Sequence, residues 1–146
     1  MPEAVEIWFE IEKDSDGYPE SQKWEQLYAW PVDGGFQLDN VPFFAKNVAV
    51  GDIVEATQTD EGWYRFGRVL KTGGHSAFRI WLAPAMQARC ATIIAEIRNM
   101  GGQAEVTLER LIGIDAAPEV EEVIWNYLEE GRHRGDWEVQ VGCSPD

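Results

Sequence analysis

The residues best suited to chemistry lie close together in Gly73-Gly74-His75-Ser76, with Arg79 three positions further on. In such a site His75 would act as a general base, Ser76 as a nucleophile and Arg79 as the group that holds an anion. Neighbouring residues of a strand point to opposite faces, which argues against a simple pair of His75 and Ser76. The same residues also suit a glycine-rich turn. A small hydrolase or anion-binding enzyme centred on them is therefore the alternative interpretation, and not the leading one.

Spacings typical of metal and cofactor sites are missing from the sequence. The two histidines, His75 and His133, and the two cysteines, Cys90 and Cys143, are too far apart for a zinc-ligand pattern. Asp14-Ser15-Asp16-Gly17 begins like a calcium loop, but the later ligand positions do not follow. The paired glycines match neither of the known phosphate-binding fingerprints. We expect no metal and no cofactor.

The charge is strongly negative and unevenly distributed. The 146 residues include 26 acidic and 12 basic side chains, which gives a formal net charge of −14. Residues 1–62 hold 14 acidic and 3 basic side chains, residues 63–100 hold 1 and 6, and residues 101–146 hold 11 and 3. Nucleic-acid binding normally requires clustered Lys and Arg against phosphates, so we expect no nucleic acid. A negative surface instead speeds the encounter with a basic partner.

The leading interpretation is a non-enzymatic module that binds a basic protein. Acidic side chains near the N-terminus would steer the partner and tryptophans would anchor it, because aromatic rings are frequent hot spots of interfaces. The expected partner-binding residues are Glu10, Glu12, Asp14, Asp16, Glu20, Trp24 and Trp63. Trp63 and Tyr64 are neighbours on one predicted strand, so one of the two must face away from the core. A third interpretation, an acidic decoy that mimics phosphate charge, differs only in what is bound.

The sequence predicts a soluble, cytoplasmic protein. No stretch is long and apolar enough for a membrane span, and no basic-plus-apolar start indicates a signal peptide. Two cysteines in a chain of this size do not form a disulfide framework. Cys90 lies in an apolar helical stripe, the usual place of a buried structural thiol. The oligomeric state stays open.

Short strands with glycine-rich turns between them dominate the chain up to Leu82, which indicates a β meander or a small barrel. The expected strands are residues 5–12, Trp24–Val32, residues 36–38, Ile53–Gln58, residues 63–71 and Ser76–Leu82. Residues 40–45 are apolar but contain Pro42, so we expect a packed loop or one helical turn there rather than a strand. The basic residues of the predicted hairpin, Arg65, Arg68, Lys71 and Arg79, are expected to pair with the acidic first strand.

From Ser76 onward the pattern predicts strand, helix, strand, helix and strand. The first helix should begin at Pro84 and close at Gly101-Gly102. The second should run from Pro118 to Gly131, with acidic residues in its first turn. Single strands are expected within residues 103–114 and over 137–141.

The fold class that follows is α+β. An N-terminal antiparallel β meander or small barrel would be fused to a C-terminal βαβαβ half that resembles an αβ plait, with Ser76–Leu82 as the seam. We divide the chain into an acidic β-rich part, residues 1–75, and the plait-like part, residues 76–146. The two are expected to form one compact unit.

Several short motifs together resemble a bacterial domain family of unknown function. They are Trp8-Phe9-Glu10, Asp16-Gly17-Tyr18-Pro19, Asp39-Asn40-Val41-Pro42-Phe43-Phe44-Ala45, Gly51-Asp52 and Gly73-Gly74-His75-Ser76. The similarity extends over residues 5–141. It implies membership and no mechanism, since the family has no established activity. Small acidic members of such families are similar to immunity proteins, which neutralise bacterial toxins.

Overall fold

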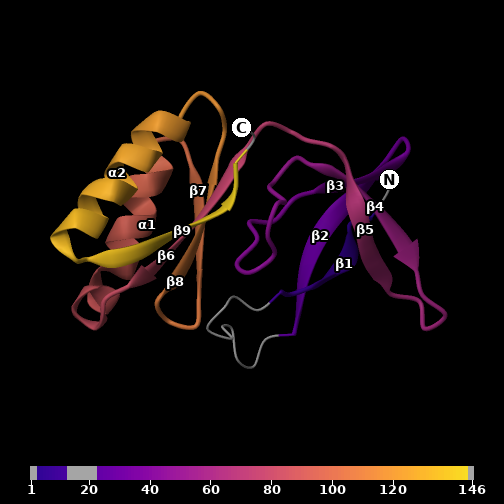
Figure 1. The fold of residues 1–146 in the computed structure, drawn as a ribbon, viewed down its shortest axis with the longest axis horizontal. Coiled ribbons are helices and arrows are strands. Elements are labelled where there is room, and N and C mark those ends of the chain that lie inside the picture. Colours follow the sequence, from indigo (N-terminus) through magenta and orange to yellow (C-terminus); the bar gives the residue numbers. More distant parts are fainter. Residues whose placement is uncertain (1–2, 13–22, 145–146) are drawn as a thin grey trace.

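The computed structural model describes residues 3–12 and 23–144, which are arranged in three layers (Figure 1). Two helices cover one face of a four-stranded sheet, and a closed barrel lies on the other side of that sheet. The α+β class is confirmed, with the barrel in the N-terminal half and both α-helices in the C-terminal half.

The barrel is built from strands in sequence order: β1 (Val5–Glu10), β2 (Trp24–Val32), β3 (Gly35–Leu38), β4 (Ile53–Gln58) and β5 (Tyr64–Lys71). Each strand pairs antiparallel with the next one. Strands that alternate in direction bring the first and the fifth into the same direction, so β1 closes on β5 in parallel. The closure removes the free edges that an open sheet would have.

Alternate residues of the strands fill the barrel. Ile7 and Phe9 of β1 are buried, while Trp8 between them points outward. The ring of Phe9 stacks on that of Phe66, with the centroids 4.5 Å apart. The other strands and the connection between β3 and β4 supply the remaining buried residues, Leu27, Ala29, Leu38, Ala45, Val48 and Val54. The expected packed loop at residues 40–45 is confirmed.

The C-terminal half is a plait with one strand more than the sequence predicts. Its elements are β6 (Ser76–Leu82), the 3₁₀ helix η1 (Pro84–Arg89), α1 (Cys90–Asn99), β7 (Gln103–Thr107), β8 (Leu111–Ala116), α2 (Glu121–Arg134) and β9 (Trp137–Cys143). The sheet order β7-β8-β6-β9 is that of a split βαβ arrangement. The expectation of one strand at 103–114 is wrong because β7 and β8 form a hairpin there. Its turn has positive φ at Leu108 and Glu109 and lacks the Gly, Pro or Asn that usually marks a turn.

The first helix begins later than expected. Pro84–Arg89 is a 3₁₀ helix, and the α-helix starts only at Cys90. Ile93 and Ile97 form its buried face against the sheet. The expected glycine stop is confirmed, since the helix ends just before Gly101, which has a φ of 100°.

The second helix continues past its predicted end. Gly131 lies inside α2, which runs to Arg134 and is capped by Gly135 with a left-handed φ of 82°. Gly131 does not end the helix but allows the ring of Trp137 to pack closely on it, because a Cβ at this position would lie 2.0 Å from that ring. The indole packs against the helix backbone and donates a hydrogen bond of 2.8 Å to the carbonyl oxygen of Leu128.

One loop of the barrel is held on the plait by two buried charges. Arg79 of β6 is 1% exposed, and its guanidinium donates to the carbonyl oxygens of Phe43, at 2.9 Å, and of Ala45. Glu25 of β2 accepts the N–H groups of Phe43, Phe44 and Ala45 at 2.6, 3.1 and 2.8 Å. The carboxylate thus satisfies the donors of the loop, and the guanidinium satisfies its acceptors. We call this arrangement the loop clamp.

The guanidinium fits into the sheet because β9 has Gly142 beside it. A Cβ at Gly142 would lie 1.5 Å from Nη1 of Arg79. The carbonyl oxygen of Gly142 also accepts the N–H of Asn47 at 2.7 Å, so the barrel loop bonds to β9 as well. Burial lowers the pKa of Arg79 to about 10, and the charge of Glu25 acts in the opposite direction. The side chain stays charged at neutral pH.

We expect Glu25→Ala to destabilise the fold strongly, because three backbone N–H groups lose their acceptor. An unsatisfied donor costs about 1–3 kcal/mol, so the loss should reach about 3 kcal/mol or more. Urea unfolding followed by tryptophan fluorescence measures it. The matched control is Gln26→Ala on the exposed side of β2, which should change the unfolding free energy by less than about 0.5 kcal/mol. Equal stability of the two variants would contradict the loop clamp.

Candidate functional site

His75, Ser76 and Arg79 are close in sequence but contact different partners. The hydroxyl of Ser76 is buried and has no hydrogen-bond partner in the part of the chain that the structure describes. The guanidinium of Arg79 is engaged in the loop clamp. Nδ1 of His75 lies 2.9 Å from Oδ1 of Asp115. Among the described residues, no hydrogen bond joins the three side chains to one another.

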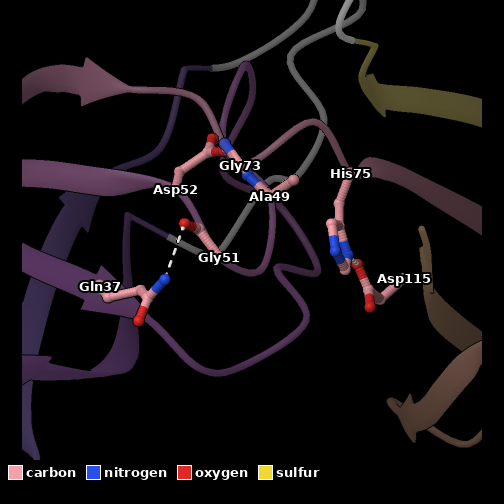
Figure 2. Close-up of polar contacts among 7 residues, drawn as sticks. All are labelled: Gln37, Ala49, Gly51, Asp52, Gly73, His75 and Asp115. Carbon is pink, nitrogen blue, oxygen red and sulfur yellow. Dashed lines mark hydrogen bonds and ion pairs between the residues drawn. The ribbon is translucent and has the colours of Figure 1, made fainter. Parts of the chain in front are cut away.

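Asp115 is the residue at this site that the sequence did not indicate. It lies on β8, 40 positions from His75, and the antiparallel pairing of β6 with β8 brings the two together (Figure 2). Burial raises the pKa of Asp115, while the hydrogen bond and charge of His75 lower it. An imidazole oriented by a carboxylate through Nδ1 can serve as a general base at its other nitrogen. No sequence spacing signals such a pair, because cross-strand register creates it.

The turn beside His75 is tied to the barrel through backbone groups. Asp52 is buried, and its carboxylate accepts the N–H groups of Ala49 at 3.0 Å and Gly73 at 2.8 Å. The amide of Gln37 donates to the carbonyl oxygen of Gly51 at 3.4 Å (Figure 2). The Gly-Asp and Gly-Gly motifs therefore hold the link between the two halves.

Within the part of the chain that the structure describes, two hollows open on the plait, and His75 lines neither of these two. One, of about 210 Å³, contains Tyr127, whose hydroxyl donates to Glu96 at 2.5 Å. Burial raises the pKa of Tyr127, and the bond to Glu96 raises it further. The other, of about 470 Å³, contains Trp81, with the guanidinium of Arg110 5.0 Å from its ring centroid. In both hollows these polar groups already contact a neighbour within the chain.

The outer surface of the barrel gathers aromatic side chains. Trp8, Trp24 and Trp63 come from β1, β2 and the residue before β5, and their ring centroids lie 6.3, 5.5 and 5.8 Å apart. Tyr28 and Trp30 continue the row along β2 and are 50% and 42% exposed. We call these five residues the aromatic wall.

Strand geometry explains the aromatic wall. The odd-numbered residues of β2 from 25 to 29 are buried, so the even-numbered ones face outward. The parallel pairing of β1 with β5 sets Trp8 beside Arg65 and thus near Trp63. Tyr64 packs on the barrel core while Trp63 lies outside, so the predicted division of these two neighbours is confirmed. The same alternation in the sequence could have indicated Tyr28 and Trp30.

Acidic residues border the aromatic wall. Glu6 and Glu10 are exposed on β1, on the same face as Trp8. Arg65 donates to Glu10 at 3.1 Å, as expected of the basic residues near the acidic first strand. Arg68 instead pairs with Glu55 of β4, and Arg79 belongs to the loop clamp. Of the predicted partner-binding residues, Trp24 and Trp63 belong to the wall, and Glu10 and the exposed Glu12 lie at the end of β1. The other three lie outside the described residues: Asp14, Asp16 and Glu20.

Residues 25–139 match the family described as a domain of unknown function (DUF4265). The chain belongs to this family. The match covers most of the barrel and of the plait, as the motif resemblance implied. A solved structure described as that of a hypothetical protein from Neisseria gonorrhoeae is similar over 99% of this chain and 97% of its own. Its TM-score is 0.75 at 19% sequence identity, so the likeness concerns the fold. No curated protein matches the sequence.

The described ranges, 3–12 and 23–144, contain neither a membrane-spanning helix nor a metal-binding cluster. No helix there is long and apolar enough to cross a membrane. No group of three or more His, Cys, Asp or Glu side chains is placed to hold a metal ion.

We expect His75→Gln to destabilise the protein at neutral pH by about 1–3 kcal/mol, because Asp115 stays buried and loses its partner. A raised pKa means that the folded state binds the proton of Asp115 more tightly than the unfolded chain does. The variant should therefore gain stability as the pH falls through that pKa toward the ordinary value of 3.8. Denaturation curves over a pH series measure this. The matched control, His75→Gln with Asp115→Asn, lacks the carboxylate and should not show the gain. Identical pH profiles would contradict the pairing.

Proposed function

We propose that this protein is a non-enzymatic module that binds a basic protein through its aromatic wall, and that the partner is a bacterial toxin domain which it neutralises. The observation that carries the proposal is the row of Trp and Tyr side chains on the outside of the barrel. Strands β1 and β2 and the residue before β5 contribute to it, and Tyr28 and Trp30 are about half exposed. Exposed aromatic side chains gathered on one face of a small protein are typical of an interaction site.

The charge of the chain supports a basic partner. The formal net charge is −14, and 14 of the 26 acidic residues lie within residues 1–62, which include most of the barrel. Such a surface accelerates association with a positive protein and repels nucleic acid. Aromatic anchors bordered by carboxylates suit a partner that presents apolar and basic side chains together.

A second candidate is a hydrolase at His75, and the observation that favours it is the 2.9 Å contact with Asp115. Because the hydroxyl of Ser76 is buried and Arg79 is engaged in the loop clamp, the nucleophile would be a water molecule that His75 activates. Loss of a hydrolytic activity in His75→Ala, with the fold and partner binding retained, would favour this candidate over the module.

We expect Tyr28→Ser combined with Trp30→Ser to weaken partner binding at least about tenfold, since exposed aromatic anchors contribute a large share of interface energy. The partner is obtained by affinity capture from the native host at low and high salt and then titrated by calorimetry. The matched control is Val123→Ser on α2, which removes an equally exposed apolar side chain far from the barrel. Capture of no basic protein at either salt would contradict the proposal, as would equal affinities of the two variants.

Charge steering makes a separate prediction about rates. Glu6→Lys combined with Glu12→Lys should slow association with the captured partner by about tenfold at low salt, and the difference should shrink as salt screens the charges. Stopped-flow tryptophan fluorescence gives the rate constants. Glu122→Lys combined with Glu130→Lys changes the net charge equally, on exposed positions of α2, and should slow association less. Equal effects of the two pairs would show that only the overall charge acts.

A further inference from the structure

We infer that Arg65 is an internal occupant of a guanidinium site on the aromatic wall, and that an arginine side chain of the partner takes its place. The inference rests on the proposed function and names the chemistry by which that surface would recognise its partner. Two observations support it: the contacts that Arg65 makes with Trp24 and Glu10, and the solvent exposure of the Arg65 and Glu10 side chains.

The surroundings of Arg65 contain both groups that recognise a guanidinium. Cζ of Arg65 lies 5.4 Å from the centroid of the Trp24 ring, within the range of a cation–π contact. The same guanidinium donates to Oε2 of Glu10 at 3.1 Å. An aromatic ring can stack on the plane of a guanidinium while a carboxylate accepts its N–H groups. This combination suits the planar fork of arginine better than the compact ammonium of lysine.

The aromatic surface extends beyond what Arg65 contacts. Trp8 and Trp63 lie next to Trp24, with centroids 6.3 and 5.8 Å from its ring. Glu6 lies two residues before Trp8 on the same face of β1. It is exposed and adds a second carboxylate on this side of the strand. An incoming side chain therefore meets more aromatic rings and more negative charge than Arg65 contacts.

The internal contact is weak enough to be replaced. The side chains of Arg65 and Glu10 are 55% and 56% exposed, so water competes for both and screens their attraction. Arg79 shows the contrast, because it is 1% exposed and fixed by backbone carbonyl groups. Arg79 is thus built into the fold, whereas Arg65 lies on the surface over the ring of Trp24.

The test is calorimetric titration of the full-length protein with an oligo-arginine peptide and with an oligo-lysine peptide of the same length. Arg65→Ala should bind oligo-arginine about 3- to 30-fold more tightly than the wild-type protein does, since the peptide no longer has to displace a cation–π contact and an ion pair. The gain for oligo-lysine should be smaller. Trp63→Leu added to Arg65→Ala should remove most of the gain.

Arg68→Ala is the matched control, because Arg68 lies on the same strand, is paired with Glu55 at 3.6 Å and carries the same charge. A larger gain for Arg65→Ala than for Arg68→Ala supports the site. Equal gains, or no binding of oligo-arginine by either variant, would overturn it. The proposed function fails separately, since it is contradicted if no basic protein is captured or if the Tyr28 and Trp30 variant keeps full affinity for the captured partner.

Discussion

The loop clamp is the interaction on which the rest of the structure depends. It places a charged pair, Glu25 and Arg79, on either side of residues 43–45 and satisfies that loop from both sides. A loop buried between two layers would otherwise leave backbone groups without partners, at a cost of about 1–3 kcal/mol each. The clamp makes it possible for a small barrel and a plait to share an interface, because the buried loop brings no unsatisfied donor at these positions.

The clamp also engages Arg79, a side chain that the sequence groups with His75 and Ser76. Arg79, Asp52 and Glu25 are buried charged residues, and each of them binds backbone groups. One nitrogen of Arg79, Nη1, is buried without a hydrogen-bond partner among the described residues. His75 differs from these three residues, since it meets a carboxylate and keeps partial exposure.

The outer surface of the barrel differs from its junction with the plait, because its charged and aromatic side chains are exposed or half-buried. Closure of β1 on β5 covers the strand edges, so the barrel presents the outer faces of its strands to solvent. The same closure gathers Trp8, Trp24 and Trp63 from β1, β2 and the residue before β5, and it sets Arg65 over Trp24. The two surfaces of this small sheet thus differ, with apolar residues inside and aromatic rings with carboxylates outside.

The sequence by itself determined most of the strands, the two helical segments and the α+β class, because period-two and helical patterns are local properties of the chain. The family followed from the resemblance of its short motifs. It missed the turn at residues 108–109, which carries no turn residue, and it assigned Gly131 to a helix end when the ring of Trp137 requires it inside the helix. Only the tertiary structure decided the partners of Glu25, His75 and Arg79. Those contacts span strands distant in sequence, and their register depends on how barrel and plait pack, which no local pattern encodes.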